Sequence, residues 1–304
     1  MNSSIFRIPR RRAMMNKNIA EAVPPPERKK LKLPIFSEIA AVPHMVWLVL
    51  FVVLPLIFVV YYAFTDIEGG FTFANIAALS QHAGTFLTSV CYALIATVIC
   101  LLIGYPLAFA ISRVPAKRQG LLIMLLMIPM WMNLLIRTYS LMAILDDGGI
   151  INGMLTAVGL PELHIIGTAG AVIFGMVYDF FPYMVLPIYS VMTKQDARLI
   201  EAAYDLGCNR LSAHFKVTLP LSVPGIISGI TMVFVPSIST FYISQKLGGG
   251  TRELIGDTIE RQINNPATRN VGAAISLVMM ILILISVTVM NKFSDDDSNG
   301  GVII

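Results

Sequence analysis

DARLIEAAYDLGCNRLSAHFKVTLP, the stretch from Asp196 to Pro220, is a polar segment between two long apolar runs. Its first half predicts a short helix, because Asp196 can act as an N-cap and the residues up to Leu206 are mostly good helix formers. Gly207 follows at the position where a left-handed backbone costs least, so the helix can end there in a sharp turn. The segment therefore begins with a short helical unit between two segments that belong in a membrane.

A second short helix is predicted for the other half, from about Arg210 to Val217, with His214 facing water. Pro220 suits the first turn of the apolar helix that follows, because its missing amide hydrogen would have no partner there. We call the two short helices and their turn the knuckle (residues 196–220). The small pair Ala202-Ala203 is expected at its tip, where small side chains let another protein approach the backbone closely.

The knuckle resembles the EAA loop of ATP-binding-cassette importer permeases. The family pattern is E-A-A, three residues, G, nine residues, I-x-L-P, and the only departure here is Val217 in place of isoleucine. In proteins that it resembles, this loop docks into a groove on a cytoplasmic ATPase and transmits its closure; the alternative is an ordinary amphipathic loop between membrane helices. The resemblance implies a coupling loop over residues 194–220. The implied coupling residues are Glu201, Ala202, Ala203, Asp205, Gly207, Leu219 and Pro220.

The composition excludes a soluble globular protein. Of 304 residues, 56% are hydrophobic and 13% are charged, whereas soluble domains average about 25% charged residues. The phosphate-binding pattern G-x-x-x-x-G-K-[ST] is absent from the sequence, so ATP and Mg²⁺ are expected on a separate ATPase chain and no cofactor or catalytic activity on this one. The scattered histidines and cysteines predict no metal site, and the net charge of +4 predicts no nucleic-acid binding, because the basic residues border the apolar segments.

Six segments are long and apolar enough to span a bilayer, which needs about 20 residues. Of the 22 Lys and Arg residues, 17 lie in the N-terminal tail, the second loop, the knuckle or after the last span. This bias predicts an all-α membrane protein with cytoplasmic N- and C-termini. We expect a basic tail over 1–40, a six-helix permease domain over 41–292 and a second tail over 293–304. The predicted spans are Val42–Phe64, Thr85–Ser112, Leu121–Met142, Thr168–Met192, Val223–Tyr242 and Val271–Met290.

Asp179 is the most unusual residue inside a predicted span. A carboxylate at mid-membrane depth costs about 2.5–3.5 kcal/mol on insertion scales, so it should face a cavity, a partner or a cation in transit. The alternatives are an ion pair with a neighbouring helix, or a position nearer the outer interface. Pro182 and Pro187 follow closely and would free backbone carbonyls that could line a path.

Polar residues in two other spans are also candidates for the solute path. Asn133 and Arg137, four residues apart, would share a face of the third span, where Arg137 is interpreted as an anchor at the membrane interface. Ser237, Thr240 and Tyr242 cluster toward the outer end of the fifth span. Their hydroxyls could bind solute or hold neighbouring helices together.

The outer loops are acidic for their size, and the loop between the fifth and sixth spans carries Glu253, Asp257 and Glu260. These carboxylates are either ordinary solvated surface or a source of local attraction for a cationic solute or a basic partner. The same loop predicts a short helix over Thr251–Asn264, with Leu254, Ile255 and Ile259 on one side.

From about Asn133 to Met290 the chain resembles the permease subunits of spermidine/putrescine importers. The matching stretches are Asn133–Tyr139, Tyr183–Tyr189, Glu201–Pro220, Pro224–Gly229 and Phe241–Ser244. The resemblance implies a bacterial inner-membrane protein that pairs with a second, homologous permease, two cytoplasmic ATPases and an extracytoplasmic polyamine-binding protein. Lys246 is a departure, because an acidic residue would suit a polyamine path there. The candidate path residues are Asp179, Tyr178, Tyr183, Ser237, Thr240 and Tyr242.

Two other functions remain open at this level. The same architecture could import ferric iron, an opine or an organic anion. A secondary transporter or a non-transporting membrane anchor is the other alternative, although inverted repeats with broken helices, typical of many secondary carriers, are not evident in the sequence.

Overall fold

The computed structural model describes residues 35–299, with side chains from Val42 to Lys292. Two compact units divide the chain at Pro55. Most of the expected N-terminal tail and the end of the C-terminal tail therefore lie outside the described residues. Helix extends into both expected tails, because α2 begins at Ile35 and α15 continues to Asn299.

In the first unit, helix α2 (Ile35–Leu48) passes into a π-helical turn over Val49–Val53. The turn ends just before Pro55, which cannot donate a backbone hydrogen bond to the preceding turn. Wider π-helical turns accommodate such interruptions of the regular ladder.

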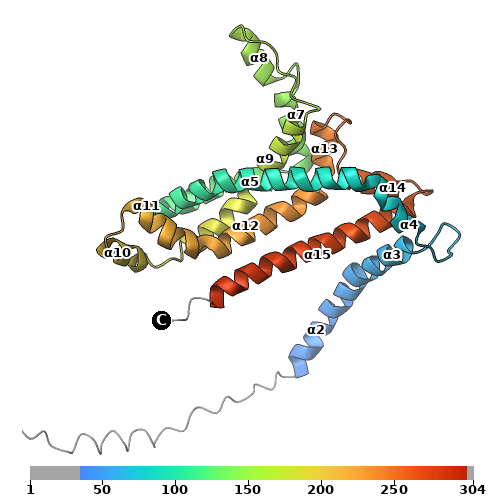
Figure 1. Cartoon of the computed structure of the whole chain (residues 1–304), viewed down its shortest axis with the longest axis horizontal. Coiled ribbons are helices and arrows are strands. Elements are labelled where there is room, and N and C mark those ends of the chain that lie inside the picture. Colours follow the sequence, from blue (N-terminus) through green and yellow to red (C-terminus); the bar gives the residue numbers. More distant parts are fainter. Residues whose placement is uncertain (1–34, 300–304) are drawn as a thin grey trace, which may run out of the picture. The chain divides into compact units, whose positions relative to one another are not determined.

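The second unit is built from helices of very different length. Along the chain, short helices connect the long ones (Figure 1). Their bounds are α3 (Leu54–Ala63), α4 (Ala74–Ala77), a 3₁₀ helix (Ala78–His82), α5 (Ala83–Arg113), α6 (Ala116–Trp131), α7 (Leu134–Leu145), α8 (Ile150–Ala157), α9 (Ala169–Met192), α10 (Ala197–Asp205), α11 (Arg210–Ala213), a π-helical turn (His214–Thr218), α12 (Leu219–Ser239), α13 (Tyr242–Leu247), α14 (Ile255–Asn264) and α15 (Arg269–Asn299).

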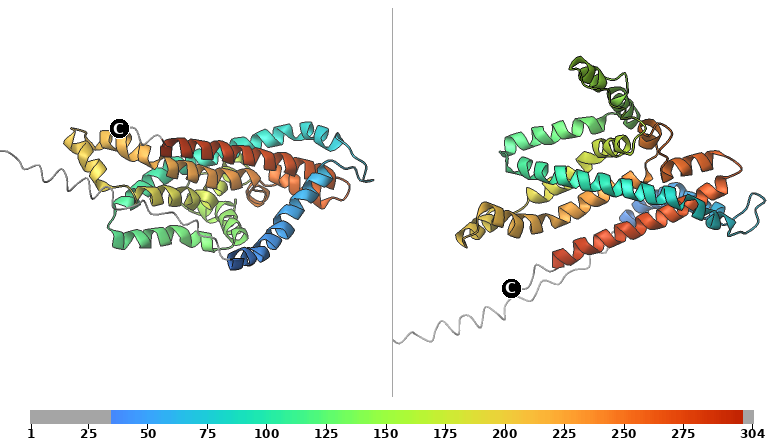
Figure 2. Two further views of the ribbon diagram at one scale, coloured as in Figure 1. Left: turned by 90° about the horizontal axis from the view of Figure 1, so that it is seen from below. Right: turned by 45° about the horizontal axis from the view of Figure 1, so that its top comes forward.

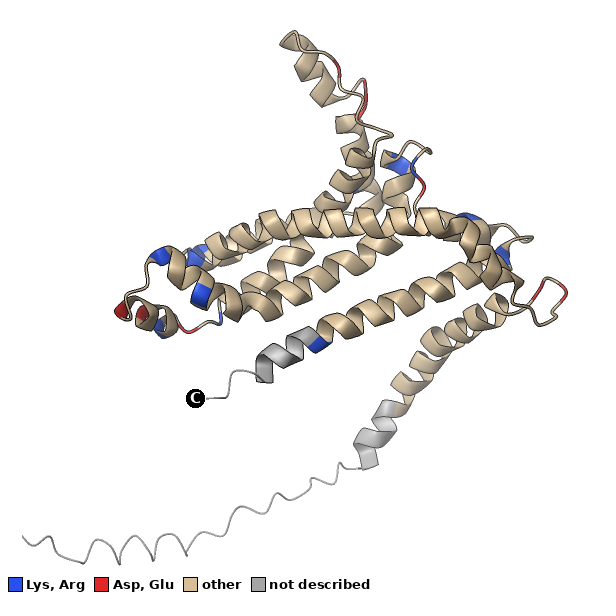
Figure 3. Ribbon diagram, viewed as in Figure 1, with Lys and Arg blue, Asp and Glu red and all other residues tan. Residues whose placement is uncertain are grey.

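Five continuous helices in the described part of the chain are long and apolar enough to cross a membrane, and a bent pair makes a sixth candidate. Apart from Asp179 in α9, the charged residues of these five helices lie at or near the helix ends, and α5, α12 and α15 are uncharged over most of their length (Figure 3). Each of these five helices contains or overlaps one predicted span, and the third predicted span is the exception. The helices of the second and fifth predicted spans begin earlier than predicted, at Ala74 and Arg210, and the helix of the fifth ends at Ser239. The continuous candidates are Val42–Ala63, Ala74–Arg113, Ala169–Met192, Arg210–Ser239 and Arg269–Lys292.

The third predicted span is broken rather than continuous. Helix α6 and the segment Leu134–Ala157 meet at an angle of 92°. Met132, just after Pro129, has an extended backbone, and the Asn133 side chain accepts a hydrogen bond of 2.8 Å from the Leu135 amide. Asn133 is therefore the N-cap of α7, and the prediction that it shares a helical face with Arg137 is wrong.

Helices α5, α9 and α12 lie side by side and make the most extensive contacts in the second unit (Figures 1 and 2). Two glycines on α12 allow the close approach to α9. A Cβ added at Gly225 would lie 2.9 Å from the Pro187 carbonyl oxygen, and one at Gly229 would lie 3.0 Å from the Met184 carbonyl oxygen. Small residues four apart permit close packing of membrane helices, so this pair positions α9, which carries Asp179.

Candidate functional site

The first half of the knuckle folds as predicted. Helix α10 begins after Asp196, whose side chain accepts a hydrogen bond of 3.0 Å from the Arg198 amide. The turn after the helix is left-handed at Gly207, with a φ of 85°. An N-cap carboxylate satisfies an amide that has no partner within the helix, so α10 has a defined beginning and end.

The second half of the knuckle differs from the prediction. Helix α11, the π-helical turn and α12 form one 30-residue helix, Arg210–Ser239. The sequence predicts a separate short helix, followed by a second helix that begins near Pro220. The π-helical turn ends directly before Leu219 and Pro220, so the missing amide hydrogen of Pro220 falls where the regular helix resumes. The knuckle is therefore continuous with a candidate membrane span.

His214 is half-buried, contrary to the expectation that it faces water. Its Nε2 atom lies 3.2 Å from the Tyr105 hydroxyl, and its ring centroid lies 4.6 Å from that of Phe109. Both aromatic residues belong to the end of α5. They line a cavity of about 620 Å³ together with Arg113, Tyr204 and other knuckle residues. The knuckle thus contacts α5 as well as continuing into α12.

The exposed surface of the knuckle includes large apolar side chains. Ala203 is buried at 6% exposure, while Ala202 is exposed, so only one of the two alanines is available to a partner. Leu206 is 85% exposed and Leu211 70% exposed. Large exposed apolar residues at one end of the molecule are typical of a protein interface. The other predicted coupling residues on the surface are Glu201, Asp205, Gly207 and Pro220, and Leu219 is partly buried.

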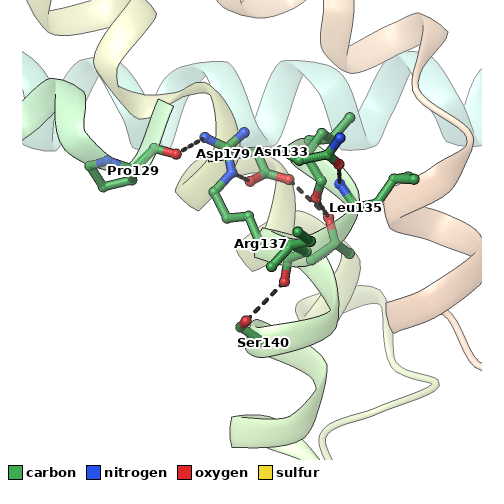
Figure 4. A network of polar contacts seen from close by, with 9 residues as sticks. Pro129, Asn133, Leu135, Arg137, Ser140 and Asp179 are labelled. Atoms are coloured by element: carbon green, nitrogen blue, oxygen red, sulfur yellow. Dashed lines mark hydrogen bonds and ion pairs between the residues drawn. The ribbon is translucent and has the colours of Figure 1, made fainter. Parts of the chain in front are cut away.

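The second site is a polar cluster between α7 and α9 (Figure 4). Asp179 is 1% exposed and forms an ion pair with the Nε atom of Arg137, which is 7% exposed. Arg137 Nη1 also donates to the Pro129 carbonyl oxygen at 3.1 Å, and the Thr138 hydroxyl lies 3.5 Å from Asp179 Oδ2. The interpretation of Arg137 as an interfacial anchor is wrong. Of the alternatives for Asp179, the structure shows an ion pair with a neighbouring helix.

A third cluster consists of two tyrosines and a lysine. The Lys246 ammonium lies 5.0 Å from the Tyr139 ring centroid and 5.7 Å from that of Tyr242, within the range of cation–π attraction. Tyr242 belongs to α13, because the fifth span ends at Ser239 and Thr240 has an extended backbone. The predicted grouping of Ser237, Thr240 and Tyr242 on one span is therefore wrong.

The remaining candidates are not brought together. Ser237 and Thr240 are buried, whereas Tyr178 and Tyr183 are each 38% exposed. The Tyr178 ring lies 5.9 Å from the Arg137 guanidinium. Only Tyr178 among these therefore approaches the Arg137–Asp179 pair closely.

Comparison with known proteins assigns the family. Residues 19–297 match the family described as binding-protein-dependent transport system inner membrane component. The chain belongs to this family. It is therefore an importer permease, as the EAA spacing of the knuckle predicts.

Two relatives carry a more specific name. The spermidine/putrescine transport system permease protein PotB of Haemophilus influenzae (strain ATCC 51907 / DSM 11121 / KW20 / Rd) is 36% identical, over 84% of this chain and 92% of that protein. The PotB protein of Escherichia coli (strain K12) is 38% identical, over 78% of this chain and 90% of that protein.

The fold is also shared with solved structures. A chain from the crystal structure of a bacterial ABC transporter involved in the import of the acidic polysaccharide alginate aligns with a TM-score of 0.70 at 19% identity, covering 86% of this chain and 95% of that chain. A second chain comes from the alginate ABC transporter in complex with an alginate pentasaccharide-bound periplasmic protein. It aligns with a TM-score of 0.68 at 19% identity, covering 85% of this chain and 93% of that one. At this identity the likeness concerns the fold alone.

In this permease, the sequence located the knuckle but not the partner of Asp179. The signal for Arg137 was available, because a second charged residue in a predicted span is a natural counter-ion for the first. Among the residues whose side chains are described, no group of three His, Cys, Asp or Glu residues could hold a metal ion.

Proposed function

We propose that this permease imports polyamines such as spermidine and putrescine. The observation that carries the proposal is the identity of 36–38% with relatives named as spermidine/putrescine permeases, over at least 78% of this chain. The buried carboxylate of Asp179 and the nearby Tyr178 ring support it, because polyamines are extended polycations. Carboxylates attract such charges and aromatic rings contribute cation–π contacts.

The proposed assembly contains this chain, a second homologous permease, two cytoplasmic ATPases and an extracytoplasmic binding protein. In it, ATP and Mg²⁺ bind the ATPases, and this chain has no catalytic role. The N- and C-termini and the knuckle face the cytoplasm of a bacterial cell. The distribution of Lys and Arg in the sequence supports this orientation.

ATP-driven closure of the ATPases would be received at the exposed surface of α10 and transmitted by two structural connections. The continuous helix Arg210–Ser239 joins the knuckle directly to the α12 segment that packs on α9. The contact between His214 and Phe109 joins the knuckle to α5. Movement of the knuckle therefore acts on two of the helices that surround α9, which carries Asp179.

Asp179 is proposed to take part in solute passage by exchanging its partner. In the structure its charge is balanced by Arg137, a cation of the chain itself. A passing polyamine would compete with the Arg137 guanidinium for the carboxylate. Such an exchange keeps Asp179 paired but leaves the Arg137 charge without its carboxylate, so Arg137 must turn to another acceptor or to water while the solute passes.

Uptake of radiolabelled spermidine tests the function directly. Cells would carry the intact chain, no chain, or a chain in which Glu201 and Gly207 are both replaced, in a strain without another polyamine importer. We expect uptake only with the intact chain, and competition by unlabelled spermidine. Equal uptake in all three strains would leave the permease family in place and contradict the polyamine assignment in favour of another solute, such as ferric iron, an opine or an organic anion.

A further inference from the structure

The cavity of about 620 Å³ between α5 and the knuckle has no place in the mechanism above. Its volume falls within the range of pockets that bind small molecules. Tyr105, Phe109 and Arg113 line it from α5, and Tyr204 and Arg210 line it from the knuckle. Among the described residues that line it there is no aspartate or glutamate. The cavity therefore combines aromatic rings with cationic side chains.

Neither Arg113 nor Arg210 has a carboxylate partner among the residues whose side chains are described. The Arg113 guanidinium lies 5.0 Å from the centroid of the Phe109 ring, a cation–π contact that keeps its charge at the wall of the cavity. Glu201 and Asp205 belong to α10, but neither lines the cavity. The charge of the lining therefore complements an anion.

Both arginines lie at the end of a candidate membrane span. The span Ala74–Arg113 ends at Arg113, and the span Arg210–Ser239 begins at Arg210. These two ends are on the side of the membrane that is proposed above to be cytoplasmic. Leu211 also lines the cavity and is 70% exposed. An exposed leucine beside two guanidinium groups at the membrane boundary suits a ligand that has both an anionic head and an apolar chain.

We propose that this cavity binds the headgroup of an acidic phospholipid from the cytoplasmic leaflet. Arg113 and Arg210 bind its phosphate, and Leu211 contacts the first part of an acyl chain. Arginine suits this role, because its planar guanidinium can donate two parallel hydrogen bonds to a phosphate. Basic pockets between membrane helices on the cytoplasmic side are typical sites for such headgroups. The bound lipid joins α5 to the knuckle. The proposal depends on the orientation proposed for the knuckle, but not on which solute is imported.

The test measures binding of phosphatidylglycerol to the whole importer, purified with its ATPases in detergent, by native mass spectrometry. Phosphatidylcholine is the lipid without net charge, and glycerol phosphate is the free anion with the same phosphate chemistry. The variants are Arg113→Gln, Arg210→Gln and, as a matched control, Arg118→Gln. Arg118 is exposed in the first turn of α6 and does not line the cavity. Each variant removes one positive charge from the same side of the membrane.

We expect the unaltered complex to bind phosphatidylglycerol about tenfold more tightly than phosphatidylcholine. Arg113→Gln and Arg210→Gln should each weaken this binding about fivefold, as loss of one basic residue near an anionic lipid predicts, and Arg118→Gln should leave it unchanged. Phosphatidylglycerol should also raise the thermal unfolding midpoint of the unaltered complex, but not that of the Arg113→Gln/Arg210→Gln variant.

Equal affinities for the two lipids would overturn the proposal. Equal weakening by Arg118→Gln would do the same, because the attraction would then be general to this side of the membrane. Displacement of the lipid by glycerol phosphate would also overturn it, and would assign the cavity to a soluble anion. No transported solute enters this test, so a failure of spermidine import would contradict the proposed function and leave this result unaffected.

Discussion

At the scale of single residues, the Arg137–Asp179 ion pair decides how a substitution can be interpreted. Both side chains are buried. Removing one partner of a buried pair costs about 3–5 kcal/mol, because the other charge is left uncompensated, whereas removing both costs far less. Loss of uptake in Asp179→Asn alone would therefore combine a stability defect with any loss of solute contact.

The double variant Arg137→Gln/Asp179→Asn separates these effects. We expect Asp179→Asn to lower the thermal unfolding midpoint of the purified complex, and the double variant to recover most of that loss. Spermidine uptake should stay low in both variants if Asp179 contacts the solute, because neither carries the carboxylate. Full recovery of uptake in the double variant would show that the pair has only a structural role.

Gly207 allows a prediction that depends on backbone geometry alone. Its φ of 85° is in the left-handed region, and a Cβ at this position would meet no other atom within 4 Å. Left-handed residues other than glycine cost about 1–2 kcal/mol, with asparagine and aspartate tolerated best. We therefore expect Gly207→Val to reduce co-purification of the ATPases more than Gly207→Asp, and Gly207→Asn to reduce it least. Equal effects of all three would contradict a backbone origin.

At the scale of elements, the packing of α12 on α9 depends on glycine, and two glycines give opposite predictions. Gly229→Ala places a methyl group 3.0 Å from the Met184 carbonyl oxygen, so α9 and α12 must separate. Gly153 lies in α8, and a Cβ there meets nothing within 4 Å. Alanine in an unobstructed helix is favoured over glycine by about 0.5–1 kcal/mol.

We therefore expect Gly229→Ala to lower the unfolding midpoint and Gly153→Ala to leave it unchanged or raise it slightly. The measurement is thermal unfolding of the complex in detergent, with both variants purified in parallel. A midpoint that falls equally in both variants would show that glycine at α12 is not needed for the contact with α9.

Some of the helices could be predicted from the sequence and others could not. Uninterrupted apolar runs located α5, α9 and α15, and N-cap and C-terminal glycine signals located α10. The break between α6 and α7 was missed, because apolarity continues across Pro129 and hides a turn that is made by backbone geometry and the Asn133 cap. The join of the knuckle to α12 was missed because Pro220 was interpreted as a new beginning.

For the whole molecule, pairs of residues distant in sequence could not be predicted from spacing alone. Asp179 was identified because a carboxylate inside a membrane-spanning segment has a high free-energy cost. Its partner depends on the angle between α7 and α9, which no local sequence pattern encodes. Similarly, Asp257 differs from Glu253 and Glu260 only in its burial, which is a tertiary property. The candidate site was thus predictable as a set of residues, and its pairings were not.

The orientation in the membrane is the prediction that belongs to the whole molecule. The excess of Lys and Arg in the knuckle and in the sequence near both termini predicts that these segments are cytoplasmic. After replacement of Cys91, Cys100 and Cys208, single cysteines at Leu206 or Asp147 would report the two sides, because Leu206 is 85% exposed and the Asp147 side chain 57%.

A membrane-impermeant maleimide should label Asp147→Cys in cells whose outer barrier is removed, and Leu206→Cys only after the inner membrane is permeabilised. The two exposed positions act as controls for each other, since both should react in detergent. The opposite pattern would reverse the topology. It would also remove the knuckle from reach of any cytoplasmic ATPase, so the coupling proposed for α10 and α12 depends on this result.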